Sequence, residues 1–181
     1  MTKSILKGLA LAGIGALLLA APATAQIKWH LGLGMNLPQG DLADEAIGDA
    51  GTGFGAHGGA TFGLGEGPIS IKADLSYETW GAGETDESFN MLGLSAAAVF
   101  GFGSGGIKPY ILGTVGWNQF SVSNDDFDAT SSMSFGGGAG ANFMLGSIGA
   151  FVEARYLLAP FTIEGTDYDM DNIPIVFGLR F

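Results

Sequence analysis

The chain has 181 residues, with 18 acidic and seven basic side chains, which gives a formal net charge of −11. This excess of acid argues against a nucleic-acid partner, because carboxylates and backbone phosphates repel each other. The chain has no cysteine, which excludes a disulfide scaffold and a lipid-modified N-terminal cysteine.

The first 25 residues have the layout of a signal peptide. Lys3 and Lys7 precede an apolar run at residues 9–20, and residues 21–25 read Ala-Pro-Ala-Thr-Ala, a small-x-small pattern typical of a cleavage site. A retained transmembrane helix is the alternative, but the run is shorter than the roughly 20 residues that span a bilayer. We expect export with residues 1–25 removed. The mature domain, residues 26–181, then has five basic residues against all 18 acids, a formal charge of −13.

Segments of alternating apolar and polar residues follow along the mature chain. We expect eight strands, at residues 27–36, 53–64, 69–79, 90–102, 107–119, 132–145, 149–158 and 173–181. Three connections are tight and rich in Gly or Ser, at residues 65–68, 103–106 and 146–147, and the four between them are longer. This alternation is typical of a meander of hairpins with short periplasmic turns and long outer loops.

The positions of the acidic residues support this strand count. Fourteen of the 18 acids fall in the four long connections: Asp41, Asp44, Glu45, Asp49, Glu84, Asp86, Glu87, Asp125, Asp126, Asp128, Glu164, Asp167, Asp169 and Asp171. An error of one strand would divide these residues between the two ends of the structure. We therefore expect one acidic rim.

The two faces of each strand differ in size and polarity. In the last strand, one face carries Ile173, Ile175, Phe177, Leu179 and Phe181. In the third strand, one face is small and polar and carries Ser70, Lys72, Asp74, Ser76 and Glu78. Small and polar residues suit the cramped lumen of eight strands, and bulky apolar residues suit lipid. The sequence predicts an all-β fold, an eight-stranded antiparallel up-and-down transmembrane barrel in the outer membrane of a Gram-negative-type cell.

The parity of several large side chains bears on the position and register of the strands. Rings of outward parity lie near strand ends, where they suit the membrane interfaces, at Trp29, Tyr77, Trp117 and Tyr156. In the fifth strand, Tyr110 and Leu112 instead share the inward parity of Lys108. We expect a bulge there to shift the register.

Three stretches carry a family resemblance. Residues 108–113 read Lys-Pro-Tyr-Ile-Leu-Gly, residues 151–157 read Phe-Val-Glu-Ala-Arg-Tyr-Leu, and residues 176–181 read Val-Phe-Gly-Leu-Arg-Phe. They resemble the small outer-membrane β-barrel family that includes opacity-type porin-like proteins and the barrel of OmpA. The resemblance implies that the barrel-assembly machinery reads a terminal signal, here at Phe177, Leu179 and Phe181. It also implies periplasmic chaperones, outer-membrane lipid and lipopolysaccharide as partners.

Charged residues of inward parity gather in the expected lumen. They are Lys28, Lys72, Asp74, Glu78, Glu153, Arg155 and Arg180. Because charges withdrawn from water persist when they are paired, we expect one ion network. A fitted network would plug the barrel, whereas a loose and hydrated one would line a narrow pore. The small diameter of eight strands favours the plug.

Three other patterns in the sequence resemble chemical sites. Enzymes among the family's relatives use His with Ser and an acid, but His30 and His57 have neither within a few residues, so we expect no catalytic site. The GxGxxG matches at residues 53–58 and 101–106 lie in strands or turns without a following helix, so we expect no cofactor. Alternating carboxylates at Asp167, Asp169 and Asp171 suggest at most a weak divalent-cation site, because the glycine and glutamate of an EF-hand loop are missing. A solvated acidic rim is the alternative.

These observations favour a structural, surface-exposed barrel with a plugged lumen and four acidic loops for interaction. The extracellular partner is not identified by the sequence. A narrow channel for small or hydrophobic solutes is the second reading, with the glycine-rich residues 136–140 as the weakest wall. A lipid-modifying enzyme is the third.

Overall fold

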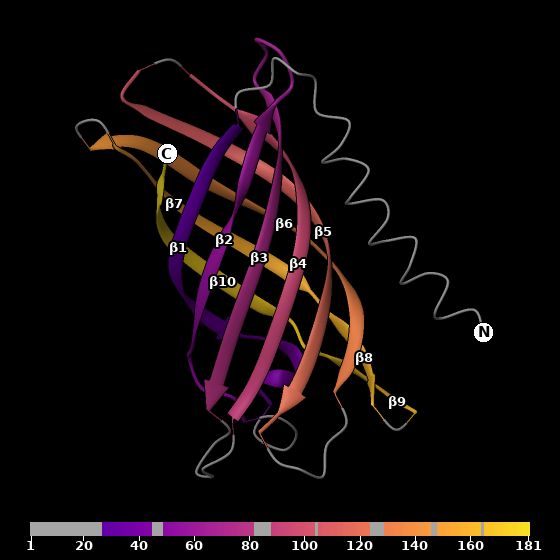
Figure 1. The fold of residues 1–181 in the computed structure, drawn as a ribbon. Helices are drawn as coiled ribbons and strands as arrows, with labels where there is room; N and C mark the ends of the chain where they lie inside the picture. The colour runs from indigo at the N-terminus through magenta and orange to yellow at the C-terminus, as the bar shows by residue number, and fades with distance from the viewer. Residues whose placement is uncertain are drawn as a thin grey trace.

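Eight strands close into one antiparallel barrel in the computed structural model (Figure 1). The structure describes residues 27–44, 49–81, 88–103, 105–123, 129–145, 148–163 and 165–181. The barrel strands are β1 (Ile27–Pro38), β2 (Gly53–Gly63), β3 (Ile69–Gly81), β4 (Ser88–Gly101), β5 (Ile107–Val122), β6 (Thr130–Leu145), β7 (Ile148–Leu158) and β10 (Asn172–Arg180). The predicted strands are confirmed, and each predicted boundary lies within three residues of the observed one.

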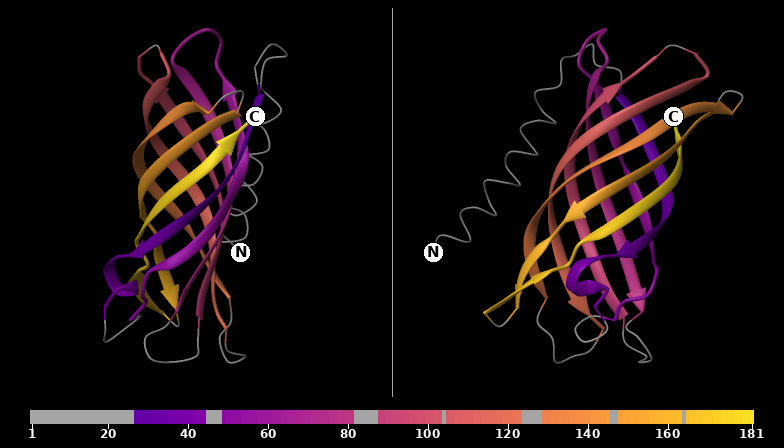
Figure 2. Two further views of the ribbon diagram at one scale, coloured as in Figure 1. Left: turned by 90° about the vertical axis from the view of Figure 1, so that its left-hand side faces the viewer. Right: turned by 180° about the vertical axis from the view of Figure 1, so that it is seen from behind.

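Neighbouring strands follow the chain as a meander, and β10 closes the ring between β7 and β1. The strand ends joined by the short connections lie at the same end of the barrel as Ile27 and Phe181, which we call the turn end (top of Figure 1). The strand ends joined by the long connections lie at the opposite end, which we call the loop end. Figure 2 shows the same separation from two further sides. The predicted alternation of short and long connections therefore gives the barrel two different mouths.

The loop end carries structure that the sequence did not predict. A 3-10 turn, η1 (Gly40–Leu42), follows β1, and a two-stranded hairpin of β8 (Pro160–Ile163) and β9 (Thr166–Asp169) precedes β10. None of the helices among the described residues is long and apolar enough to cross a lipid bilayer.

The predicted faces of the strands are confirmed. On β1, the side chain of Leu33 is 71% exposed, and on β10 that of Phe177 is 58% exposed. On the lumen side, Glu78 of β3 and Glu153 of β7 are each 1% exposed. Bulky apolar residues thus cover the outer surface where they meet lipid, and the charged residues of the strands point into the interior.

The bulge expected in β5 is absent, and that prediction was wrong. Pairing of β5 with β4 and with β6 continues without interruption past Tyr110 and Leu112. Both side chains point into the lumen, where they are buried. Gly140 lies opposite Tyr110 on β6, and a Cβ atom there would come within 2.5 Å of the tyrosine ring. The glycine provides the room that lets a large ring lie inside a narrow barrel.

The glycine-rich part of β6 forms an intact wall. Residues 136–140 pair with β5 on one side and with β7 on the other. Gly138 similarly lies opposite Arg155, and a Cβ atom at this position would come within 3.1 Å of the arginine Cγ. These glycines make space for lumen side chains, and the backbone shows no lateral opening among them.

Candidate functional site

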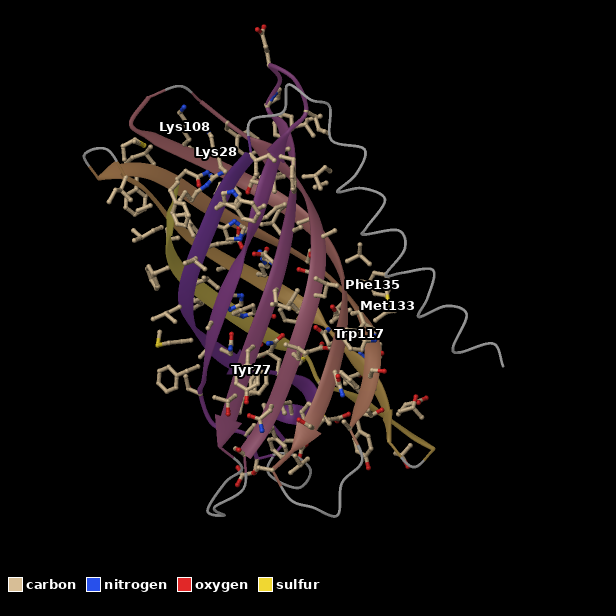
Figure 3. The ribbon with its side chains drawn as sticks, viewed as in Figure 1. Lys28, Tyr77, Lys108, Trp117, Met133 and Phe135 are labelled. Atoms are coloured by element: carbon tan, nitrogen blue, oxygen red, sulfur yellow. The ribbon has the colours of Figure 1, made fainter. Side chains whose placement is uncertain are left out.

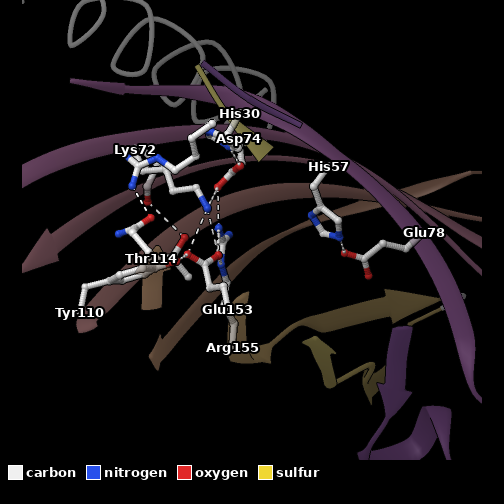
Figure 4. A network of polar contacts seen from close by, with 12 residues as sticks. His30, His57, Lys72, Asp74, Glu78, Tyr110, Thr114, Glu153 and Arg155 are labelled. Carbon is white, nitrogen blue, oxygen red and sulfur yellow. Dashed lines mark hydrogen bonds and ion pairs between the residues drawn. The ribbon is translucent and has the colours of Figure 1, made fainter. Parts of the chain in front are cut away.

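Four charged side chains form ion pairs in the middle of the lumen (Figure 4). Lys72 Nζ lies 3.0 Å from Glu153 Oε1 and 3.4 Å from Asp74 Oδ2. Arg155 Nη2 lies 2.5 Å from Asp74 Oδ2 and 2.5 Å from Glu153 Oε1. All four are at least 93% buried. Because two positive and two negative charges meet, the group is formally neutral, which burial requires.

Two further side chains join these pairs. Asp74 Oδ1 lies 2.6 Å from His30 Nε2, and the Tyr110 hydroxyl donates to Glu153 Oε2 at 2.7 Å. We call the six residues the ion network: His30, Lys72, Asp74, Tyr110, Glu153 and Arg155. Three strands separate β3 from β7 in either direction around the ring, and the same holds for β1 and β5. The ion network therefore ties opposite walls of the barrel together.

Three of the seven residues predicted to form one network, Lys28, Glu78 and Arg180, lie outside the ion network. The prediction of a single network was therefore wrong. Lys28 is exposed at the start of β1 and makes no ion pair among the described residues. Arg180 donates to the neutral Asn142 Oδ1. Glu78 lies four residues beyond Asp74, about 13 Å along the strand, where it accepts a hydrogen bond from Asn172 Nδ2 at 2.7 Å. The charged residues do not form one network because they lie at different positions along the barrel axis.

A small polar gap lies on the loop side of the ion network. Its volume is about 20 Å³, and His57, Asn118 and Ser134 are among its lining residues. The Nε2 atom of His57 lies 4.0 Å from Glu78 Oε1. This volume has room for about one water molecule. The lumen is thus almost filled at this level.

A second layer closes the lumen at the loop end. We call it the apolar cap, and its buried residues are Leu42, Ala50, Trp80, Met91, Phe120, Ala159, Phe161 and Met170. Trp80, Met91 and Phe120 point inward from the loop-end parts of β3, β4 and β5, and Phe161 comes from the β8–β9 hairpin. The rings of Phe120 and Phe161 have centroids 5.7 Å apart.

Hydrogen bonds of the backbone and of the Asp171 carboxylate hold the cap in place. Met170 N donates to Ala159 O at 3.0 Å, and Ala50 N donates to Leu42 O at 3.0 Å. Asp171 accepts from Ala159 N at 3.0 Å and from the Tyr156 hydroxyl at 3.2 Å. The described residues of the connections that precede β2 and β10 therefore cover the mouth of the barrel.

The apolar cap was missed by the sequence reasoning, although parity could have found part of it. Trp80 shares the inward parity of Glu78, and the register carries this face to Met91 and then to Phe120. Large apolar residues of inward parity at the ends of three consecutive strands indicate a covered mouth. The contribution of Phe161 had no such signal, because it lies in a segment that was read as an acidic loop.

The structure does not assemble the cation site considered for the fourth loop. Asp167 accepts a hydrogen bond from Thr162 Oγ1, and the carboxylate of Asp171 is used by the cap. Among the described residues, no three His, Cys, Asp or Glu side chains gather closely enough to hold a metal ion. Eight further loop acids lie outside the described residues: Glu45, Glu84, Asp86, Glu87, Asp125, Asp126, Asp128 and Glu164. The signal peptide predicted at residues 1–25 lies outside them as well.

The two histidines have acidic neighbours that sequence proximity did not reveal. His30 pairs with Asp74 from β3, 44 residues away in the chain, well beyond the few neighbouring residues considered in the sequence. The remaining ring nitrogen, Nδ1, is buried and has no hydrogen-bond partner among the described residues. A His–Asp pair of this kind lacks the third member, a nucleophilic hydroxyl bonded to the histidine.

The residues expected to carry the assembly signal lie on the outer surface of the barrel. Phe177, Leu179 and Phe181 are 58%, 47% and 67% exposed. Phe181 exchanges two backbone hydrogen bonds with Trp29, at 2.8 and 3.0 Å. The aromatic end of the chain is thereby fixed against the first strand with its side chain outward.

Solved structures with the same architecture come from several outer-membrane proteins. Neisserial surface protein A superposes with a TM-score of 0.69 at 15% identity, covering 86% of this chain and 97% of that one. Ail, the attachment invasion locus protein of Yersinia pestis, has a TM-score of 0.51 at 15% identity, covering 86% and 97%. The outer membrane enzyme PagL has a TM-score of 0.52 at 17% identity, covering 85% and 98%. At such identities the likeness shows the fold alone.

Comparison with protein families is more specific. No curated protein matches the chain. The model of the outer membrane protein beta-barrel domain matches residues 9–181, and this range includes every strand described above. The chain therefore belongs to the family of outer-membrane β-barrel domains, and its place is the outer membrane.

Proposed function

We propose that the protein is a structural, surface-exposed barrel with a closed lumen, and that its loop end contacts an extracellular partner. The observation that carries this proposal is the presence of two layers in series, the ion network and the apolar cap, with a gap of about 20 Å³ between them. A channel needs a continuous hydrated path from one mouth to the other.

The two layers oppose conduction for different physical reasons. The side chains of the ion network satisfy one another, so opening a path between them would leave buried charges without partners. The apolar cap presents aromatic and aliphatic surface to any water in the lumen, and hydrophobic constrictions of this kind exclude ions by dewetting. Either layer alone would hinder an ion.

The chemistry of the loop end suggests what it could bind. Acidic residues gather there, and the described ones include Asp41, Asp49 and Asp167, while none of the five basic residues of the mature chain lies in a loop. Ail has been crystallised with the heparin analogue sucrose octasulfate, a polyanion. The acidic loop end would repel such a ligand, so we propose a positively charged partner for this protein.

The proposal includes the route to the membrane. Residues 1–25 act as a cleaved signal peptide, periplasmic chaperones carry the mature chain, and the barrel-assembly machinery reads Phe177, Leu179 and Phe181. Outer-membrane lipid and lipopolysaccharide then surround the apolar face. Replacing Phe181 by Ser should lower the amount of assembled barrel in cells, and an unchanged amount would contradict this role for the aromatic end.

The proposal gives the protein no catalytic role. A lipid-modifying enzyme would need an accessible nucleophile beside its histidine, and the His30 side chain is 1% exposed within the ion network. Incubation of the refolded protein with radiolabelled lipopolysaccharide should release no acyl chain, and release that is lost on His30→Ala would contradict this part.

Electrical recording tests the closed lumen. Refolded residues 26–181 should give no conductance steps in a planar bilayer. The Glu153→Gln/Arg155→Gln variant should also be silent, because it keeps the Lys72–Asp74 pair and the apolar cap. Adding Phe120→Ala and Phe161→Ala to that variant should produce steps, which shows that the assay detects an open barrel. Discrete steps from the unaltered protein would overturn the proposal and favour the narrow channel.

A further inference from the structure

The turn end of the barrel contains a cavity of about 560 Å³, between the mouth and the ion network. We call it the vestibule. Residues from all eight barrel strands or their turns line it, with Phe151 and Tyr110 as aromatic walls. Its volume lies within the range of about 300 to 1,000 Å³ typical of small-molecule sites. The vestibule is on the side of the ion network opposite to the apolar cap.

Basic residues converge on this cavity. Lys28, Lys72, Lys108 and Arg180 all line it, and they are four of the five basic residues of the mature chain. Figure 3 shows Lys28 and Lys108 together at the turn end. Glu66 is the one acidic residue in the lining of the vestibule as the structure describes it. In a mature chain whose formal charge is −13, such a grouping is not expected from composition.

Most of this positive charge is not neutralised inside the protein. Lys72 is paired with Glu153 and Asp74. Lys28, Lys108 and Arg180, in contrast, have no carboxylate within 4.0 Å among the residues that the structure describes. Arg180 is held by the side-chain oxygen of Asn142, which orients one guanidinium nitrogen without cancelling its charge. These three positive charges face one negative charge, that of Glu66, so the vestibule carries an excess of two positive charges.

The concave shape strengthens the effect of these charges. Three cations on an open surface would be screened by salt, whereas a cavity with low-dielectric walls focuses their field and raises the local concentration of anions. A guanidinium fixed on one side keeps further N–H donors for oxyanions, and two lysines on flexible stems can adjust to the ligand.

We infer that the vestibule binds a small anion that carries a phosphate group. A phosphate monoester has a charge of about −1.5 to −2 near pH 7 and several strong acceptor oxygens, which matches the excess charge and the donors of Lys28, Lys108 and Arg180. The turn end faces the periplasm in barrels of this kind. The phosphate could belong to a soluble compound or to a lipid headgroup at the rim, and both have the same chemistry.

Calorimetric titration with inorganic phosphate tests this inference on refolded residues 26–181 in phosphatidylcholine nanodiscs at constant ionic strength. The Lys28→Gln/Lys108→Gln variant should bind phosphate about tenfold more weakly, because two charge-assisted contacts are lost. Both side chains are exposed and unpaired, so the barrel should fold normally, as its heat-dependent gel mobility would show. Arg180→Gln should weaken binding similarly.

Glu66→Gln is the matched control, because it changes the charge of the same cavity in the opposite direction. It should strengthen phosphate binding several-fold. Equal binding by the unaltered protein and the double lysine variant, or weaker binding by the Glu66 variant, would overturn the inference.

A second pair of nanodiscs separates the two sources of phosphate. If a lipid headgroup is the occupant, discs with phosphatidylglycerol should weaken the titration by competition, and this effect should require Lys28 and Lys108. If the occupant is soluble, the two kinds of disc should give the same affinity. Phosphate binding that is absent from both kinds of disc would overturn the inference.

Discussion

The ion network and the apolar cap close the same lumen by opposite chemistry. In the network, charged side chains from opposite walls meet at defined distances, so its stability depends on each partner and on strand register. In the cap, aromatic and aliphatic side chains pack together without directional bonds. A narrow barrel can thus combine one layer that specifies register with another that seals a mouth by burial. The two layers should therefore respond differently to mutation.

The largest effect should come from removing a carboxylate of the ion network. Glu153→Ala leaves Lys72 and Arg155 with one acid between them and removes the acceptor of the Tyr110 hydroxyl. Breaking a buried pair in this way costs about 3 to 5 kcal/mol. Urea unfolding in lipid vesicles, followed by tryptophan fluorescence, should show this loss. Glu66→Ala, at an exposed turn, is the control and should stay within about 0.5 kcal/mol of the unaltered protein.

A substitution in the apolar cap should affect mainly the cap itself and leave the rest of the barrel unchanged. Phe161→Ala removes a buried ring that packs on Phe120 and anchors the β8–β9 hairpin, with a cost of about 3 kcal/mol. Because the hairpin pairs in a sheet separate from the barrel, hydrogen exchange should accelerate in β8 and β9 and stay slow in β3 and β4. Uniform acceleration over the whole barrel would contradict the distinction between the two layers.

A smaller effect is expected where a glycine makes room for the ion network. Gly140→Ala places a methyl group within 2.5 Å of the Tyr110 ring, which should cost about 1 to 3 kcal/mol by overpacking. Gly113→Ala is the matched control on the outer face of β5, where a Cβ atom would meet nothing within 4 Å. Equal unfolding free energies for the two variants would show that Tyr110 does not need this space.

The smallest effect should have the opposite sign. Glu78 is buried between the two layers and has a neutral hydrogen-bond donor, Asn172, with His57 Nε2 4.0 Å away. Glu78→Gln removes a charge that has no Lys or Arg partner and keeps an acceptor oxygen for Asn172, so the free energy of unfolding should rise by about 1 kcal/mol. A loss of stability as large as that of Glu153→Ala would mean that Glu78 belongs to the ion network.

Sequence reasoning was sufficient for the strands and their faces because both depend on local signals. A side-chain period of two sets Leu33 outward and Glu78 inward whatever the rest of the chain does. Tight glycine-rich turns then fix the order of the hairpins. The strand boundaries could be predicted as well, because the turn residues that end each strand are also a local signal.

The interior required information that no single strand contains. His30 meets Asp74, and Tyr110 meets Glu153, because closure and stagger of the barrel bring distant strands together. Parity placed Tyr110 inside, but only the glycine at position 140 of a neighbouring strand explains how it fits. The hairpin at residues 160–169 was hidden by its acids and Pro160, which are typical of loops.

The chain has no cysteine, so one introduced thiol can test directly whether the lumen is closed on both sides. Ser134 is buried and lines the small gap between the ion network and the apolar cap. In the Ser134→Cys variant, a small charged thiol reagent should fail to label the folded barrel from either mouth, and should label it fully after unfolding. Rapid labelling of the folded barrel from either mouth would contradict a lumen closed by two layers.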